Sequence, residues 1–176
     1  MRFSELAIPG VWLVEPEQIS DERGFFARTV CEAEFSQRGL PASYCQSSIS
    51  FNPRLGTLRG MHYQAAPSQE QKLVRCTRGA IYDVVVDLRP NSPTFKQWAS
   101  AELSGSNRLA LAIPQGCAHG FLTLADDSEV LYMMSEPQNA SLATGVRWND
   151  PQFGISWPMA PVVMSAKDAA CPDFAG

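Results

Sequence analysis

Short runs of apolar, aromatic and β-branched residues, separated by closely spaced turn signals, recur through most of this chain and constrain its fold more than any other feature. The runs cover residues 11–14, 24–30, 43–51, 57–64, 72–77, 80–88, 95–103, 109–113, 119–124 and 130–134. Turn-forming pairs such as Asn52-Pro53 and Arg78-Gly79 lie between them. Many short strands without long helices between them predict an all-β barrel or sandwich.

Two short helices are expected beside these strands. Residues 31–38 contain helix-forming Glu and Ala and precede Gly39, which suits the C-terminal cap of a helix. Ser165 can cap a second short helix, in which Asp168 lies three residues later and could serve only to complete the capping arrangement. The polar segment 20–23 is interpreted as a turn between the strands at 11–14 and 24–30. No repeat or change of composition divides the chain, so residues 1–176 are predicted to form one domain.

Composition and charge exclude several classes of protein. With 45% hydrophobic residues the chain can bury a substantial core, but its longest apolar run is far too short for a membrane span. The net charge is −4 and no basic cluster is interleaved with aromatic residues, so neither a membrane nor nucleic acid is an expected partner. The five cysteines are scattered and never spaced C-x-x-C, which favours reduced thiols. The first residues carry no export signal, and the expected location is the cytoplasm.

The segment 56–72 holds the main candidate for chemistry, because one of the two histidines of the chain, His62, lies there between Arg59 and Lys72. An imidazole flanked by fixed positive charge suits a base that removes a proton from carbon in a phosphorylated substrate. A single histidine is also often structural, and this segment alone leaves both interpretations open. Asp83 is equally open: it interrupts the apolar run 81–87 and would face either a barrel interior, where it needs a partner, or solvent.

Several catalytic classes lack their motifs. The segment 114–119 resembles the second half of the cupin metal motif, but Tyr63 and Gln64 follow His62 where a second histidine would be needed, so no metal is expected. Gly-x-Ser-x-Gly, Walker and dinucleotide patterns are absent, so no activated serine, ATP or NAD site is expected. The side chains left for acid and base chemistry are His62, Lys72, Asp83, His119, Asp168 and Tyr132. They suit proton transfer next to a carbonyl with a cation at the enolate oxygen, but composition and spacing do not distinguish this from simple binding.

A series of motifs resembles one known family over nearly the whole chain, in order and at matching spacing. The motifs are Arg59-Gly60-Met61-His62-Tyr63-Gln64, Lys72-Leu73-Val74-Arg75, Asp83-Val84-Val85-Val86-Asp87-Leu88-Arg89, Ser92-Pro93-Thr94-Phe95, Ile113-Pro114-Gln115-Gly116, Ala118-His119-Gly120-Phe121 and Trp148-Asn149-Asp150-Pro151. Together they resemble the dTDP-4-dehydrorhamnose 3,5-epimerases. The resemblance implies a cupin-type jelly roll that works as a homodimer, without metal or other cofactor, on a nucleotide-linked 4-keto-6-deoxy sugar.

The same resemblance implies roles for individual residues. His62 matches the base that removes the proton beside the C4 ketone, and Asp168 matches the carboxylate paired with it. Tyr132 matches the acid that returns a proton on the opposite face, and Lys72 matches the group beside the sugar O4, with Asp83 and His119 around it. Arg59 matches a diphosphate contact. The remaining ligand-contact positions are Arg23, Gln46 and Ser50.

Three differences from the family pattern fall toward the nucleotide or the rim of the pocket rather than at the proton-transfer centre. Residues 133–138 replace the usual Lys-Thr-Thr-Asp-Tyr-Tyr, so Gln138 stands where an aromatic side chain would stack on the base. Arg28 replaces a glutamate, and Ser47 with Ser48 replaces Asp-Asn. The leading hypothesis is therefore an epimerase acting at C3, C5 or both. The alternatives are a single-centre epimerase that uses a different nucleotide and a non-catalytic sugar-binding barrel.

Overall fold

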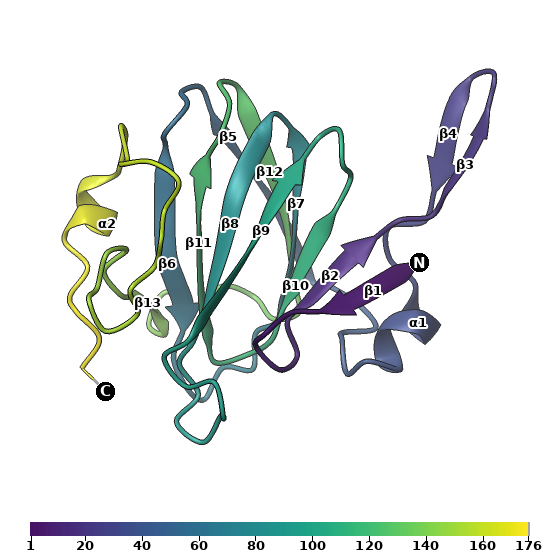
Figure 1. Ribbon diagram of the computed structural model, residues 1–176. Helices are drawn as coiled ribbons and strands as arrows, with labels where there is room; N and C mark the ends of the chain where they lie inside the picture. Colours follow the sequence, from purple (N-terminus) through teal and green to yellow (C-terminus); the bar gives the residue numbers. More distant parts are fainter. Residues whose placement is uncertain (176) are drawn as a thin grey trace.

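The computed structural model describes residues 1–175, and within them the chain forms thirteen strands and two short helices (Figure 1). The elements are β1 Arg2–Glu5, β2 Trp12–Glu15, β3 Gln18–Asp21, β4 Gly24–Ala27, α1 Glu32–Ser36, β5 Gln46–Asn52, β6 Leu58–Gln64, β7 Lys72–Arg78, β8 Ala80–Asp87, β9 Trp98–Ser104, β10 Ala110–Ile113, β11 Cys117–Thr123, β12 Ser128–Met134, β13 Ala143–Gly145 and α2 Ala166–Ala169. The prediction of an all-β fold with a few short helices is confirmed. No helix among residues 1–175 is long and apolar enough to cross a membrane.

Two sheets face each other and enclose the main core (Figure 1). One has the strand order β1-β2-β10-β7-β12-β5, and the other has the order β13-β6-β11-β8-β9. Side chains alternate along each strand, so Val74 of β7 and Val85 of β8 point between the sheets and pack with Phe121 of β11. This two-sheet arrangement gives the barrel an interior lined by residues far apart in the sequence.

Each sheet also buries apolar side chains on its outer face. Phe35 of α1 is fully buried there and packs with Leu73 of β7 against the six-stranded sheet. Val84 of β8 points away from the barrel interior and packs with Phe153 of the segment that follows β13. Both outer layers therefore continue the alternation of the strands beneath them.

The segment that follows β13 is fixed beside β6 by backbone hydrogen bonds. Leu58 N donates to Val163 O at 2.8 Å, and Val162 N donates to Gly56 O at 2.8 Å. This places α2 next to β6 although more than one hundred residues separate the two elements (Figure 1). Side chains of α2 can therefore reach residues carried by β6.

The N-terminal region differs from the sequence prediction in its strand pairing. Ser20 and Asp21 belong to β3, which forms a hairpin with β4, so only residues 22–23 make the turn. Asp21 closes this turn by accepting a hydrogen bond from Arg23 N at 2.9 Å. The strand predicted at 11–14 corresponds to β2, which pairs with β1 and β10 instead. β3 contains one apolar side chain, Ile19, and therefore has no pattern that would have indicated a strand.

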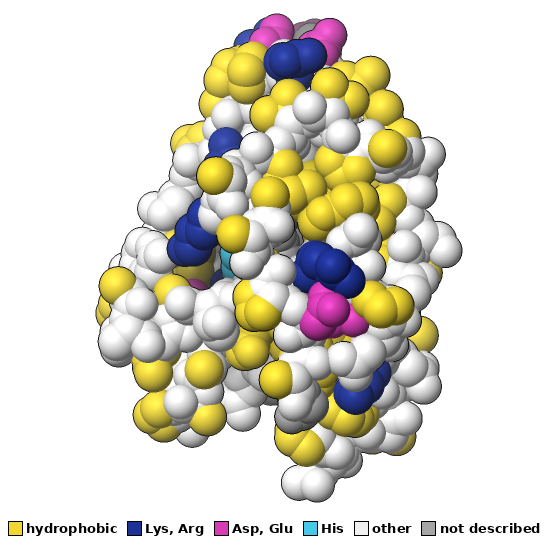
Figure 2. Space-filling view, turned by 90° about the vertical axis from the view of Figure 1, so that its left-hand side faces the viewer, with side chains coloured by type: hydrophobic (Ala, Val, Ile, Leu, Met, Phe, Trp, Pro, Cys, Tyr) yellow, Lys and Arg dark blue, Asp and Glu magenta, His cyan; other side chains and the backbone are white. Residues whose placement is uncertain are grey.

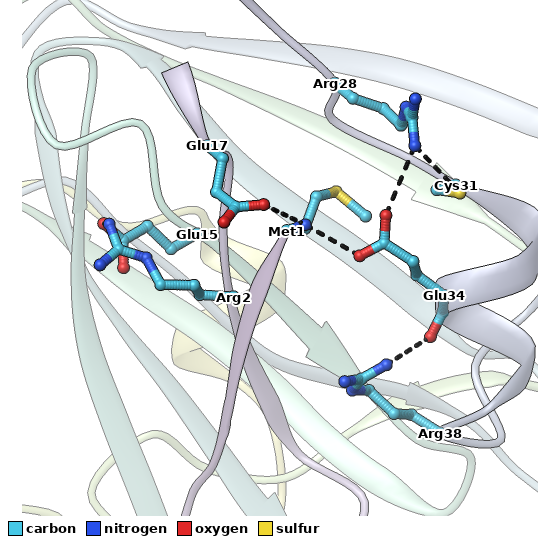
Figure 3. Close-up of polar contacts among 8 residues, drawn as sticks. All are labelled: Met1, Arg2, Glu15, Glu17, Arg28, Cys31, Glu34 and Arg38. Atoms are coloured by element: carbon cyan, nitrogen blue, oxygen red, sulfur yellow. Dashed lines mark hydrogen bonds and ion pairs between the residues drawn. The ribbon is translucent and has the colours of Figure 1, made fainter. Parts of the chain in front are cut away.

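The hairpin β3–β4 projects from the body (Figure 1), and ion pairs hold the chain at its base (Figure 3). The Met1 ammonium lies 2.7 Å from Glu17 Oε2 and 2.8 Å from Glu34 Oε2. Arg28, just beyond β4, lies 3.5 Å from Glu34 Oε1. These contacts connect β1, the start of the hairpin and α1, so the base of the hairpin is attached to the body. Nearer the tip, the Arg108 guanidinium lies 5.4 Å from the centre of the Phe25 ring.

Candidate active site

A cavity of about 360 Å³ opens between the two sheets. Its walls are built by β5, β7 and β12 of one sheet, by β6, β11 and β13 of the other, and by α2. The lining residues are Ser48, Ile49, Ser50, Arg59, His62, Tyr63, Gln64, Glu70, Lys72, His119, Phe121, Tyr132, Met134, Gln138, Ala143, Thr144 and Lys167. Figure 2 shows a hollow on this side of the molecule, with a histidine visible inside it and basic side chains nearby.

β6 supplies both Arg59 and His62 to this cavity, although residues three apart on a regular strand face opposite sides. The cause is an irregular register with β11, in which His62 lies opposite His119 and Arg59 lies opposite Phe121. Three residue steps along β6 thus match two along β11. A β-bulge of this kind changes the direction of the side chains after it, and here it turns His62 toward the interior.

The two strands approach so closely at the bulge that both need glycine there. A Cβ on Gly60 would lie 2.5 Å from the Cα of Gly120, and a Cβ on Gly120 would lie 2.7 Å from Arg59 O. Gly60 also has a φ of +137°, which side chains rarely tolerate. The glycines of the motifs at 59–64 and 118–121 therefore position the functional side chains beside them.

His62 is held by a carboxylate from the other end of the chain. His62 Nε2 lies 2.7 Å from Asp168 Oδ1, and Asp168 Oδ2 accepts a hydrogen bond from Gly60 N at 3.3 Å. Because a carboxylate only accepts, this contact assigns the proton of the neutral ring to Nε2 and leaves a lone pair on Nδ1. Burial lowers the pKa of His62 below its ordinary value of 6.5, although Asp168 raises it, and His119 and Lys72 lower it further. The imidazole is therefore neutral at pH 7 and available as a base.

The position of Asp168 in α2 sets the direction of its side chain. Ser165 caps this helix as predicted, because its Oγ accepts a hydrogen bond from Asp168 N at 3.0 Å. The Asp168 carboxylate itself does not complete the cap but points toward His62, and its side chain is 6% exposed. The sequence also allowed Asp168 to serve only to complete the cap of this helix, and that interpretation is therefore wrong.

Tyr132 of β12 brings a protonated phenol to the same cavity. Its hydroxyl lies 3.5 Å from Ser50 Oγ, and its ring packs edge to face against His119 with the centroids 6.2 Å apart. Burial strongly raises the pKa of Tyr132 above its ordinary value of 10, which outweighs the opposing hydrogen bond from Ser50. The phenol therefore keeps its proton at any ordinary working pH and can act as an acid.

His119, which lines the cavity, and Asp83 form a second buried pair. His119 Nε2 lies 2.6 Å from Asp83 Oδ1, and the side chains are 5% and 0% exposed. Asp83 thus faces the barrel interior rather than solvent, which settles the alternative that periodicity left open. Within residues 1–175 its second oxygen, Oδ2, has no hydrogen-bond partner.

The basic side chains of the cavity differ in how their charge is balanced. Lys72 Nζ lies 3.2 Å from Glu70 Oε2. Arg59 donates to Asn52 Oδ1 at 2.7 Å, and neither Arg59 nor Lys167 has a carboxylate partner in the part of the chain described here. The uncompensated positive charge of the cavity therefore lies at Arg59 and Lys167.

The structure brings most of the sequence-predicted residues together, with two exceptions. Gln46 is outside the cavity lining, although its Oε1 accepts a hydrogen bond from the backbone of the lining residue Gln138 at 3.0 Å. Arg23 lies at the tip of the projecting hairpin, where it pairs with Asp21 and is 85% exposed. Arg28 lies at the hairpin base and is likewise absent from the lining. The hairpin thus carries the expected ligand position Arg23 outside the cavity lining of its own chain.

Several polar residues of the cavity escaped the sequence analysis, among them Lys167, Glu70 and Gln64. Lys167 immediately precedes the predicted site residue Asp168, and this position could have indicated that Lys167 also belongs to the site. Glu70 lies two residues before Lys72, and side chains at that spacing point to the same side of an extended chain. Gln64 ends the motif at 59–64; its amide Nε2 is buried and finds no partner within residues 1–175. Residues 1–175 as a whole contain no cluster of three His, Cys, Asp or Glu side chains that could hold a metal ion.

Comparisons with known proteins match this chain over nearly its whole length. The family model described as dTDP-4-dehydrorhamnose 3,5-epimerase matches residues 5–176. The dTDP-4-dehydrorhamnose 3,5-epimerase of Sinorhizobium fredii is 42% identical over 175 residues, which cover 99% of this chain and 90% of that protein.

Solved structures give the same result. A dTDP-4-dehydrorhamnose 3,5-epimerase from Bacillus anthracis, with TDP and PPi bound, superposes with a TM-score of 0.94 at 39% identity and covers 98% of this chain and 99% of its own. ChmJ, a 3'-monoepimerase from Streptomyces bikiniensis in complex with dTDP-quinovose, superposes with a TM-score of 0.87 at 33% identity, covering 96% and 85%. The cupin-type barrel and the resemblance seen in the motifs are thereby confirmed, and the chain belongs to the dTDP-4-dehydrorhamnose 3,5-epimerase family.

Proposed function

We propose that this protein is an epimerase that inverts C3, C5 or both in a nucleotide-diphospho-4-keto-6-deoxyhexose, in deoxysugar biosynthesis. The observation that carries the proposal is that one cavity holds the His62–Asp168 pair, the Tyr132 phenol and the Lys72 ammonium. A neutral base, a protonated acid and a cation are what proton transfer beside a ketone requires. The dTDP and TDP ligands of the solved relatives support the substrate class.

The proposed reaction proceeds by removal and return of a carbon-bound proton. His62 takes the proton from the carbon beside the C4 ketone, and the electron pair of that C–H bond moves into the enolate. Asp168 stabilises the imidazolium that forms, and Lys72 donates a hydrogen bond to the enolate oxygen. Tyr132 gives its proton to the opposite face of the carbon, which inverts the centre, and solvent then restores both groups.

The distribution of charge supports one orientation of the substrate. Lys72 is already neutralised by Glu70, so the pair suits an uncharged ketone oxygen better than a diphosphate. Arg59 and Lys167 keep their positive charge, and a guanidinium fork suits two phosphate oxygens. We therefore expect the diphosphate at Arg59 and Lys167 and the sugar ketone at Lys72.

Solvent deuterium incorporation tests the proposal. The protein is incubated in D₂O with dTDP-4-keto-6-deoxyglucose, and deuterium at C3 and C5 is followed by proton NMR. We expect both incorporation and inverted product. No exchange with this substrate or with its counterparts carrying other nucleotide bases would contradict the proposal and favour a non-catalytic sugar-binding barrel.

A single-centre epimerase is the second candidate. It is supported by Ser48 and Gln138, which line the cavity in place of the usual family residues, and by the likeness to a 3'-monoepimerase. The same NMR experiment separates the two candidates, because a single-centre enzyme would leave one of the two ring positions uninverted. Repeating it with several nucleotide bases identifies the preferred one.

The pH dependence should follow the imidazole. Because the pKa of His62 is lowered, kcat/KM should stay constant through neutral pH and fall only below about 6.5, as the base becomes protonated. Asp168→Asn removes the carboxylate that raises this pKa, so the acidic limb should move to lower pH. The plateau should fall by up to about 10⁴-fold, because the ring loses the partner that holds its tautomer. A limb that moves to higher pH would contradict the assignment of His62 as the base.

We also infer that the protein works as a homodimer in which the hairpin tip of one subunit reaches the cavity of the other. Arg23 falls at a ligand position of the family but lies away from the cavity of its own chain. The hairpin also exposes apolar side chains that a second copy could cover, with Ile19 72% and Phe26 74% exposed. A second subunit accounts for both observations.

Subunit complementation should reveal this arrangement. Arg23→Ala leaves a cavity intact but removes the tip contact, and it should raise KM about tenfold. His62→Ala leaves the tip intact but removes the base. In mixed dimers one cavity meets an intact tip, so an equal mixture should regain about a quarter of wild-type activity at low substrate concentration. The variants are co-expressed with different tags, and Arg2→Ala, which removes another exposed, ion-paired arginine, is the control.

Activity of the mixture that equals the mean of the two variants measured separately would contradict an active site shared between subunits. A monomer in sedimentation experiments at catalytic concentrations would contradict the dimer itself.

A further inference from the structure

Glu70 places a buried negative charge inside the cavity that the reaction described above does not use. Its side chain is 8% exposed, and its Oε2 lies 3.2 Å from Lys72 Nζ, whose side chain is 16% exposed. Both residues line the cavity with His62 and Tyr132. A carboxylate in such a place is costly unless it is paired, so Glu70 needs either a partner or a task.

The local backbone holds the two side chains together. Gln71, between them, is fixed to the start of the segment after β12, because Gln71 N donates to Ser135 Oγ at 2.8 Å and Gln71 O accepts from Ser135 N at 3.0 Å. Glu70 N donates to Ser68 Oγ at 3.2 Å. Side chains on either side of an extended residue point the same way, so Glu70 and Lys72 enter the cavity as a pair.

From this geometry we infer that Glu70 is a positioning residue that fixes the Lys72 ammonium at the ketone oxygen; the inference rests on the proposed function. An ammonium group has three N–H donors. One donor is occupied by Glu70, which fixes the direction of the other two toward the substrate. Without Glu70 the long lysine side chain would have several rotamers available, and a misplaced cation stabilises the enolate poorly.

The pair also affects which part of the substrate binds beside it. A lysine whose charge is balanced by a buried carboxylate attracts a diphosphate weakly. Glu70 therefore reserves this end of the cavity for the sugar and leaves the diphosphate to Arg59 and Lys167. The substrate class that fits is a sugar with a ketone oxygen beside Lys72 and an anionic group at the opposite end.

A double-mutant cycle with Lys72 tests the inference, with kcat and KM measured separately. Glu70→Ala should lower kcat for deuterium exchange about tenfold and change KM less than twofold, since the contact acts on the position of Lys72. Lys72→Met should lower kcat about 100-fold. In the Lys72→Met background, Glu70→Ala should change kcat less than twofold, because the group that it positions is gone. Glu102→Gln, which removes an exposed carboxylate on β9, is the control.

Substitutions of similar size keep the test decisive if Lys72→Met does not fold. Glu70→Gln retains an oxygen that accepts from the ammonium and should keep kcat within about threefold of wild type, whereas Glu70→Leu should behave like Glu70→Ala. Equal losses from Glu70→Ala in both backgrounds, a rise in KM alone, or a Glu70→Gln variant as slow as Glu70→Leu would overturn the inference. Wild-type protein that exchanges no deuterium would instead overturn the proposed function.

Discussion

Replacing His62 by alanine should stop carbon-bound hydrogen exchange almost completely. No second base shares its place, because the other cavity histidine, His119, is held by Asp83 at 2.6 Å. General base catalysis contributes about 10²- to 10⁴-fold, so exchange at both ring positions should fall by about 10³-fold or more. The rate of deuterium incorporation measures the loss directly, independently of which centre is inverted.

The control for this substitution is the stability and ligand binding of the variant. The His62 side chain is 41% exposed, so its removal opens the cavity to solvent rather than leaving a void in the core. The thermal midpoint and the affinity for dTDP should therefore stay close to wild type, and added imidazole should restore part of the exchange. Exchange at more than a tenth of the wild-type rate in His62→Ala would contradict the role of the imidazole as the base.

The sequence predicts the strands of the two sheets better than those of the N-terminal region. Val84 and Val86 pack on one face of β8 while Ile81 and Val85 pack on the other, so the whole strand appears as an apolar run. β3, in contrast, projects from the body and has no buried face, so nothing in its composition separates it from a loop. Strand prediction from composition thus depends on burial, and it fails where a strand is exposed on both faces.

The pairing of His62 with Asp168 could not have been derived from the sequence pattern without the family resemblance. The two residues are 106 positions apart, and their contact depends on the backbone bonds that fix the C-terminal segment beside β6. The bulge at Gly60 is equally hidden, because strict alternation would place Arg59 and His62 on opposite faces. Residue types were compatible with proton transfer but did not distinguish it from simple binding, and long-range backbone geometry decides which residues meet.

Arg23 and Glu70 show two ways in which site positions taken from a family pattern can differ from the cavity of one chain. Arg23 fills a ligand position of the family, yet it is absent from the lining of its own cavity, and we have therefore proposed that it serves a second subunit. Glu70 fills no assigned position, yet it contacts the Lys72 ammonium directly. A family pattern gives positions along the chain, whereas the cavity is defined by neighbours in space.

Two titratable pairs meet in this cavity with different surroundings. Both histidines line the cavity, but the His62 side chain is 41% exposed, whereas His119 and its partner Asp83 are 5% and 0% exposed. The ring of Tyr132 packs against His119, so the buried pair supports the wall that holds the phenol. His62 of β6 and Tyr132 of β12, the proposed base and acid, thus lie on different sheets, as the proposed reaction on opposite faces of a flat enolate requires.

Replacing Tyr132 by phenylalanine should separate exchange from inversion. The variant keeps the aromatic ring, which packs between His119 and Phe121, and loses only the hydroxyl that contacts Ser50, so the fold should be retained. His62 can still remove the proton and return a deuteron to the same face, so exchange should remain within about tenfold of wild type. Formation of the inverted product should fall by about 10³-fold, because the opposite face has lost its acid.

Both results come from one incubation in D₂O, in which NMR resolves deuterated substrate from deuterated product. Tyr82→Phe is the matched control: its hydroxyl accepts a hydrogen bond from Ser100 at 2.8 Å, and its ring packs with Trp157 outside the cavity. This control should invert its substrate at the wild-type rate. If Tyr132→Phe forms inverted product as fast as it exchanges deuterium, the acid must be another group, and the pairing of His62 with a phenol across the enolate is wrong. If both exchange and inversion are lost, the phenol is needed to bind the substrate rather than to deliver a proton.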